Sequence, residues 1–365
     1  MEKTGTASLP LHPGKAPRWL FGRMVKLAKA ISGVMIYEYG HKRFLQTISD
    51  PFWFQAFSCV LGFDWHSSGT TTVTCGALKE ALTADEGMRI AGGKGKSSKK
   101  TLEEIEIIGK EMGLRGDAVD TLKYSSRMAA KVDNAALQDG YKLYHHAIII
   151  SEDGDWAVIQ QGMNVDSRYA RRYHWLSDNV KSFVEEPHDA ILGRGGEVMD
   201  MTARESKDAR DISVDLVNDD PRHLKREWEL LKKPSWQTTL DGWKGMKNPH
   251  LEMPRRINWN VMKGMYEFQP KNYEEMLSTK GVGPATVRAL AFISELMYGS
   301  PPSWKDPIKY SFAVGGKDGI PYPVNRKAMD EATSLIREGI NEAKIGNEEK
   351  LRTVKRLKKI LPQPL

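Results

Sequence analysis

Residues 277–290 read LSTKGVGPATVRAL, and this stretch predicts two helices joined by a tight turn. Gly281 and Gly283 allow the backbone to turn sharply and to lie close to another molecule. Pro284 can open the second helix, where its missing N–H costs nothing. Val282 lies between the two glycines and is expected to plug the core. The sequence therefore predicts a compact helical hairpin in the C-terminal part of the chain.

The backbone of this turn predicts a phosphate-binding site. The N–H groups of Gly281, Gly283 and Ala285 are expected to point outward at a helix N-terminus, where hydrogen bonding and the helix dipole favour an anion. Lys280 adds a positive charge beside them. The alternative is an ordinary turn between two helices that binds no ligand.

Residues 277–327 resemble the helix-hairpin-helix region of the base-excision DNA glycosylase superfamily. Lyase-competent members carry a lysine where this chain has Ala285, so the resemblance implies a monofunctional, lesion-directed glycosylase. It also implies a catalytic aspartate, for which Asp306 and Asp318 are candidates. Asn325 stands in a turn like the superfamily's aspartate turn, and an amide cannot act as a general base. The DNA-binding residues that the resemblance implies are Lys280, Gly281, Val282, Gly283, Ala285, Thr286, Arg326 and Lys327.

Six further strings carry a second resemblance, over nearly the full length. They are TGTASLPLH at 4–12, FDWHSSGTTT at 63–72, LYHHAIII at 143–150, WAVIQQGMN at 156–164, ARRYHW at 170–175 and YSFAVGGKDGIPYPVNRK at 310–327. On these strings the chain resembles a mostly archaeal conserved-protein family, a domain of unknown function. This resemblance implies a prokaryotic housekeeping-type protein and carries no activity with it.

The middle of the chain predicts a β-hairpin with polar residues around it. His145 and His146 are neighbours on its first strand, so they point to opposite faces. Histidines, acids and arginines here could build a metal-dependent nuclease site within residues 145–188, with a divalent metal as cofactor. The arginines could instead bind a nucleic-acid backbone beside aromatic rings, or all these residues could be polar core partners. The candidates are His145, His146 and His174 for catalysis, and Arg171 and Arg172 for DNA binding.

The glycine- and lysine-rich segment GGKGKSSKK at 92–100 is not a Walker-type phosphate loop. Such a loop needs a glycine where this chain has Ile90, and the preceding residues have a helical pattern rather than a strand pattern. We interpret the segment as a basic loop that can touch a nucleic-acid backbone.

The chain has 365 residues and a net charge of +7, which is distributed unevenly. Residues 221–365 hold 26 Lys+Arg and 16 Asp+Glu, a net of +10, so the first 220 residues carry −3. Positive charge gathered in one part of a chain is typical of a protein that binds a polyanion. Two cysteines cannot form a disulfide framework. No apolar run is long enough for a spanning helix, and the N-terminus has no signal-peptide pattern, so we expect a cytoplasmic protein.

These observations predict a mainly α protein with a small antiparallel β insertion (α+β) and a C-terminal helix-hairpin-helix domain. The expected domains are helical residues 1–140, a β-hairpin insertion at 141–200, an irregular connector at 201–258 and the basic domain at 259–365. The expected partner is double-stranded DNA, damaged or structured, and a monovalent cation at the hairpin is a further candidate. A nuclease with its site at 145–188 and a non-catalytic DNA-binding protein are the alternatives to a glycosylase.

Overall fold

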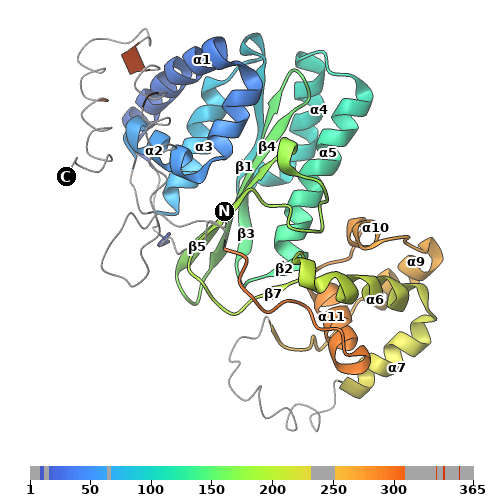
Figure 1. The fold of residues 1–365 in the computed structure, drawn as a ribbon. Coiled ribbons are helices and arrows are strands. Elements are labelled where there is room, and N and C mark those ends of the chain that lie inside the picture. The colour runs from blue at the N-terminus through green and yellow to red at the C-terminus, as the bar shows by residue number, and fades with distance from the viewer. Residues whose placement is uncertain are drawn as a thin grey trace.

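A five-stranded antiparallel sheet lies at the centre of the computed structural model, which describes residues 9–11, 16–63, 67–231 and 251–308 and four single residues, Ser334, Ile340, Asn341 and Thr353. The strand order is β1-β3-β4-β5-β6 (Figure 1). The strands are β1 (Met88–Lys94), β3 (Lys142–Ser151), β4 (Trp156–Asn164), β5 (Tyr169–Leu176) and β6 (Ala190–Leu192). A separate pair joins β2 (Leu137–Gln138) to β7 (Met199–Asp200).

Helices cover both faces of the sheet, which makes a three-layer arrangement (Figure 1). One face packs against α1 (Arg18–Ser49), α2 (Pro51–Leu61) and α3 (Gly69–Ala81), and the other against α4 (Thr101–Glu111) and α5 (Gly116–Lys131). Because side chains alternate along a strand, Ile149 enters the first core and its neighbour Ile148 the second. The two buried faces explain why β3 is apolar at nearly every position.

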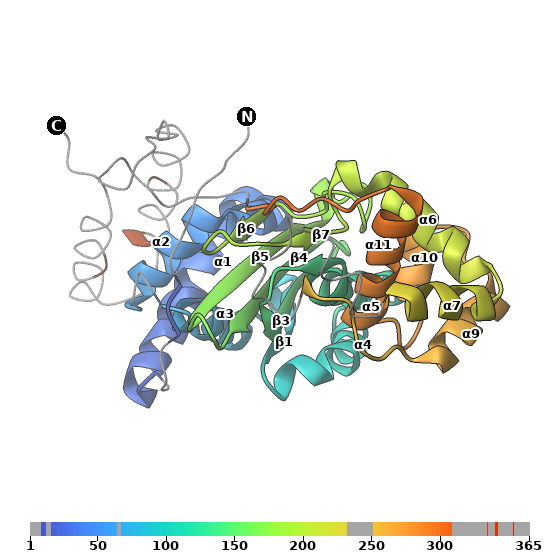
Figure 2. The same cartoon turned by 90° about the horizontal axis from the view of Figure 1, so that it is seen from below.

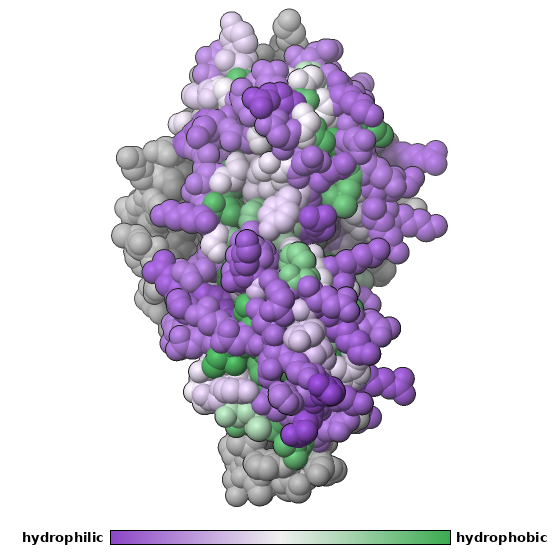
Figure 3. Space-filling model, turned by 90° about the vertical axis from the view of Figure 1, so that its right-hand side faces the viewer, coloured by the Kyte–Doolittle hydropathy of each residue, from purple (hydrophilic) through white to green (hydrophobic). Residues whose placement is uncertain are grey.

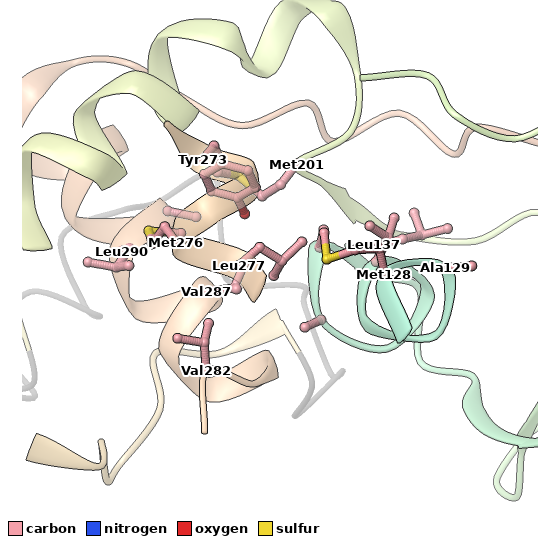
Figure 4. Close-up of a cluster of buried hydrophobic side chains, with 14 of the residues drawn as sticks. Met128, Ala129, Leu137, Met201, Tyr273, Met276, Leu277, Val282, Val287 and Leu290 are labelled. Carbon is pink, nitrogen blue, oxygen red and sulfur yellow. The ribbon is translucent and has the colours of Figure 1, made fainter. Parts of the chain in front are cut away.

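A group of helices gathers beside the sheet and shares the core of its α5 face (Figure 2). The group consists of α6 (Lys207–Asn218), α7 (Pro221–Leu231), α9 (Trp259–Phe268), α10 (Tyr273–Ser278) and α11 (Pro284–Tyr298). In the shared core, Met128 and Leu137 lie opposite Leu277 and Val287 (Figure 4). The helix group is therefore packed on the sheet layer by continuous apolar contact.

The predicted class, mainly α with an antiparallel sheet, is confirmed, but the sheet is not confined to residues 141–200. The segment 88–94 is strand β1 and pairs with β3. We had interpreted its first residues as helical and residues 92–94 as the start of the basic loop. Glycines disfavour strands, yet at Gly92 φ is +91° and an added Cβ would lie 2.2 Å from the carbonyl oxygen of His146. Only glycine allows β1 and β3 to pair this closely at residue 92. Gly92 therefore makes the strand possible, although glycine in a sequence argues against a strand. Within the predicted irregular connector, α6 and α7 are regular helices.

In the described parts of the chain, no helix combines the length and the apolar character needed to span a membrane.

Candidate functional site

The predicted helical hairpin is formed by α10, a turn at residues 279–283 and α11. Asn272 caps α10 by accepting a hydrogen bond from the Glu275 amide at 2.9 Å. Val282 is 3% exposed and packs in the core, as predicted, and Pro284 is the first residue of α11 (Figure 4). Val287, Leu290, Ala291 and Ser294 are buried along one face of α11, whereas Met297, near its C-terminal end, is 44% exposed.

The two glycines of the turn have different roles. Gly281 has φ +92°, and a Cβ added there would lie 2.6 Å from Cγ2 of Val261 on α9. The fold itself therefore requires glycine at this position. Gly283 has an extended backbone (φ −143°, ψ −174°), and no atom lies within 4 Å of its potential Cβ. Nothing in the described chain requires glycine at 283, where the backbone is open to close approach from outside.

The amides of the turn face an open helix N-terminus. Gly283 is the N-cap of α11 and offers no capping side chain. Within the described residues, the N–H groups of Gly281, Gly283 and Ala285 have no hydrogen-bond acceptor. Lys280 is exposed beside them. Two residues that we predicted to contact DNA, Val282 and Thr286, are instead buried and can only shape the turn.

Side chains from the sheet layer hold the turn in place. Lys131 donates to the carbonyl oxygen of Thr279, and Gln138 donates to that of Pro284 at 2.8 Å. Arg288 donates to Gln138 at 2.8 Å. Burial, with a contribution from Arg127, lowers the pKa of Lys131 to about 8. The ammonium group of Lys131 therefore lies at a carbonyl oxygen of the turn.

Arg171, predicted to bind DNA, is fully buried in an ion-pair network and does not reach the surface. It donates to Asp139 at 3.0 Å and to Asp306 at 2.6 Å, and Tyr173 also donates to Asp139, at 2.6 Å. Burial opposes the charge on Arg171, but the two carboxylates outweigh it and raise its pKa. The group links β5 to the segments that carry Asp139 and Asp306, which is a structural role.

Arg172 points to the opposite face of the sheet and is also fully buried. Its guanidinium lies 4.6 Å from the ring centroid of Phe54 and 3.4 Å from the side-chain oxygens of Gln55 and Thr71. Thr71 in turn donates to Gln161 on β4. The prediction that Arg171 and Arg172 contact DNA is therefore corrected, because neither side chain is accessible.

The predicted catalytic histidines are buried and lie on different faces, as expected for neighbours on a strand. His146 binds Ser126 and Gln160, both at 2.8 Å, on the α5 face. His174 lies edge-on to Phe54 on the other face. His145 is 1% exposed, and neither of its ring nitrogens has a hydrogen-bond partner among the described residues. Across the described residues, no three His, Cys, Asp or Glu side chains are arranged to hold a metal ion.

Buried His145 makes stability depend on pH. Burial, with smaller contributions from His146 and Lys94, lowers its pKa from 6.5 to about 3. The unfolded chain binds the proton first, so stability falls as the pH drops below 6.5 towards 3. We expect the free energy of unfolding to lose up to about 1.4 kcal/mol per pH unit from this residue. Urea unfolding at about pH 7 and about pH 5 measures the loss.

His145→Leu should make this pH dependence shallower, because it removes the titrating ring without breaking a hydrogen bond. His223→Gln, at an exposed position, is the matched control and should leave the pH dependence unchanged. An equal pH dependence in wild type and His145→Leu would contradict the assignment.

Three hydrogen bonds fix the carboxylate of Asp306. Its Oδ2 accepts from Arg171 and, at 2.9 Å, from the amide of Gly196, and its Oδ1 accepts from Ile308 at 3.2 Å. A carboxylate with both oxygens engaged in this way is poorly placed to act as a base. The other predicted residues of this set lie outside the described part of the chain: Asp318, Asn325, Arg326 and Lys327.

Two clefts lie on the helical side of the molecule, and neither is lined by a predicted catalytic residue. One, of about 820 Å³, runs between α4 and α5. The other, of about 520 Å³, lies between the loop at 182–185, α6 and the start of α10. This side is mainly hydrophilic, with small separate apolar patches (Figure 3). It therefore presents no broad apolar surface.

Two buried acids that the sequence did not single out, Asp133 and Asp139, each hold a separate group of buried side chains. Asp133, in the π-helical segment Val132–Ala136, accepts from Gln160 at 2.6 Å and from Trp175 at 3.0 Å. π-Bulges are frequent at functional sites. Asp133 follows the end of α5 and Asp139 follows β2, and neither is marked by a local signal in the sequence. Their partners are far away in sequence, so the sequence alone could not identify them.

Comparison with protein families matches residues 5–324 to the model of a family described as "protein of unknown function (DUF763)". No curated protein and no solved structure gave a match. The matched region includes the whole sheet and the hairpin of α10 and α11. The chain therefore belongs to the DUF763 family of proteins of unknown function.

Proposed function

We propose that this protein binds DNA and that the backbone of residues 279–285, at the core of a helix-hairpin-helix domain, holds a phosphate. The observation that carries the proposal is Gly283, a partly exposed backbone position where the described chain has no need of glycine. Unpartnered amides at the N-terminus of α11 supply hydrogen bonds and a favourable dipole. Lys280 supplies a charge at the same place.

The charge of the chain supports the same proposal, but indirectly. Residues 251–308, which contain the hairpin, hold seven Lys+Arg and six Asp+Glu. Most of the +10 of residues 221–365 therefore belongs to segments outside the described residues. The hairpin thus contributes oriented amides more than net charge, and we expect it to contact one phosphate group rather than a long stretch of backbone.

The most concrete form of the proposal is a monofunctional DNA glycosylase. Ala285 has no amine to form a Schiff base, so such an enzyme would use water and a carboxylate such as Asp318. Incubation with damaged duplexes in EDTA, followed by alkali, should then reveal strand breaks at the excised base. Strands that stay intact across a panel of lesions would refute the glycosylase. The proposal would then be that of a non-catalytic DNA-binding protein.

Gly283→Val should weaken duplex binding by about 10- to 100-fold. A branched side chain there would stand between the phosphate and the amides, and hydrogen bonds to a charged group contribute about 1.5–3 kcal/mol. The fold should tolerate the change, because no described atom outside the neighbouring residues lies within 4 Å of the Cβ position. Fluorescence anisotropy with a labelled duplex gives the dissociation constant, and circular dichroism checks folding.

Gly116→Val is the matched control for this measurement. Gly116 is an exposed glycine at the start of α5, also with no atom within 4 Å of its potential Cβ. It should bind duplex DNA like the wild type. Equal affinities for wild type and the folded Gly283→Val protein would refute the hairpin as the contact.

A further inference from the structure

Seven exposed basic side chains gather at one end of the sheet, although residues 1–220 as a whole carry a net charge of −3. In an antiparallel sheet, the end of one strand lies beside the start of the next. Here Lys94 is opposite His145 near the start of β3, and Asn164 at the end of β4 is opposite Tyr169. We call this surface the basic end; it comprises Lys94, Lys96, Lys99, Lys100, Lys142, Arg168 and Arg194.

Tyrosine rings lie between these charges. Lys94 is 5.9 Å from the ring centroid of Tyr144, and Arg194 is 4.3 Å from that of Tyr169. Both rings are half-buried, so each is held by the sheet and keeps an accessible part. Basic side chains interleaved with fixed aromatic rings are what proteins use to bind single-stranded nucleic acid, through its backbone and its bases.

Hydrogen bonds fix the loop at the basic end. Lys79 donates to the carbonyl oxygen of Gly92 at 2.7 Å, and Glu104 accepts from the amide of Gly92 at 2.7 Å. Ser98 donates to the carbonyl oxygen of Gly95 at 2.6 Å. A surface fixed in this way binds with less loss of conformational freedom than a flexible lysine tail.

The basic end lies close to the hairpin. Lys142 follows Gln138 by four residues, and Gln138 donates to Pro284 in the hairpin turn. Four residues span at most about 14 Å, and the five strands are about 19 Å across at roughly 4.8 Å per step. One DNA molecule can therefore reach the hairpin and the basic end together.

We propose that the basic end binds a single-stranded segment of the same DNA whose duplex part is held by the hairpin. This rests on the proposed function and deepens it, because it makes the preferred substrate a junction between duplex and single strand. The tyrosines favour a single strand over a second duplex, since only unpaired bases can stack on them.

The test is the triple variant Lys96→Ala/Lys99→Ala/Lys100→Ala, measured by anisotropy with a single-stranded oligonucleotide, a blunt duplex and a forked duplex. Its affinity for the single strand should fall about tenfold or more, and the slope of log affinity against log salt should decrease by about 2. The blunt duplex should be bound as by the wild type.

The matched control is Lys42→Ala/Lys110→Ala/Arg115→Ala, which removes the same charge at the other end of the sheet. Lys42 pairs with Asp178 beyond the end of β5, and Lys110 adjoins Glu111, which pairs with Arg89 near the start of β1. Equal loss of single-strand affinity in both triple variants would overturn the proposal, because it would mean that only net charge matters.

Three further results test this proposal, and the last two separate it from the proposed function. Tyr169→Leu should weaken single-strand binding while Tyr169→Phe does not, and equal affinities for the two variants would overturn the stacking role. A wild-type protein that binds the blunt duplex but no single strand would overturn the proposal for the basic end and leave the hairpin proposal standing. Single-strand binding that is lost in the lysine triple variant, without duplex binding by the wild type, would support the basic end and refute the hairpin.

Discussion

Asp139→Ala is expected to lower the free energy of unfolding by about 3–5 kcal/mol, the usual cost of removing one partner from a buried ion pair. Asp139 is 6% exposed, and it accepts from Arg171, from Tyr173 and, at 3.0 Å, from the backbone amide of Tyr141. Its loss leaves a buried guanidinium with Asp306 as its remaining carboxylate. Urea unfolding, followed by circular dichroism, measures the change.

Asp166→Ala, at an exposed position in the turn before β5, is the control and should change stability by no more than about 0.5 kcal/mol. The double variant Asp139→Leu/Arg171→Met should be more stable than Asp139→Ala, because it removes the stranded charge along with its partner. A cost for Asp139→Ala as small as that of the control would contradict the buried network.

Gly281→Ala is expected to destabilise the protein by about 2–4 kcal/mol. A left-handed backbone costs a residue with a Cβ about 1–2 kcal/mol, and the new methyl group would overlap Val261 on α9, which adds an overpacking cost. Gly283→Ala should be nearly neutral, because its backbone is extended and its surroundings are empty. Chemical unfolding of both variants compares the two glycines directly.

A double-mutant cycle isolates the contact with α9. Val261→Ala removes the side chain that the added methyl group would meet, so Gly281→Ala should cost less in that background than in the wild type. Equal costs for Gly281→Ala and Gly283→Ala would show that the turn does not have the described geometry.

The hairpin could be predicted from the sequence because its signals are local. Pro284 can only open a helix, and Val282 is the apolar residue between two glycines, so a short stretch defines the turn. The sequence could not tell the two glycines apart. The requirement at Gly281 comes from Val261, twenty residues away, and only the fold brings them together.

The polar residues of the sheet were misinterpreted because the contacts that decide their role are not local in the sequence. Arg171 and Arg172 are adjacent arginines in a polar string, which locally is typical of an exposed nucleic-acid contact. The partners that bury Arg171 are Asp139 and Asp306, at separations of 32 and 135 residues. A sequence pattern shows that a residue is charged, but not whether a distant partner will neutralise it inside the protein.

The sequence also does not reveal the basic end, because this surface is assembled from segments that are distant in the chain. Its residues come from four separate segments, so the net charge of the first 220 residues conceals them. The loop at 92–100 was predicted as basic, but its neighbours Lys142, Arg168 and Arg194 join it only through the strand order. Sheet topology, rather than composition, gathers this charge.

Amide NMR of protein labelled with ¹⁵N at glycine and alanine shows directly whether the amides of the hairpin turn hold a DNA phosphate. On addition of a duplex, we expect shifts and slowed hydrogen exchange at Gly281, Gly283 and Ala285, with Gly116 unchanged. Duplex binding that perturbs other amides and leaves these three unaffected would contradict the hairpin as the contact.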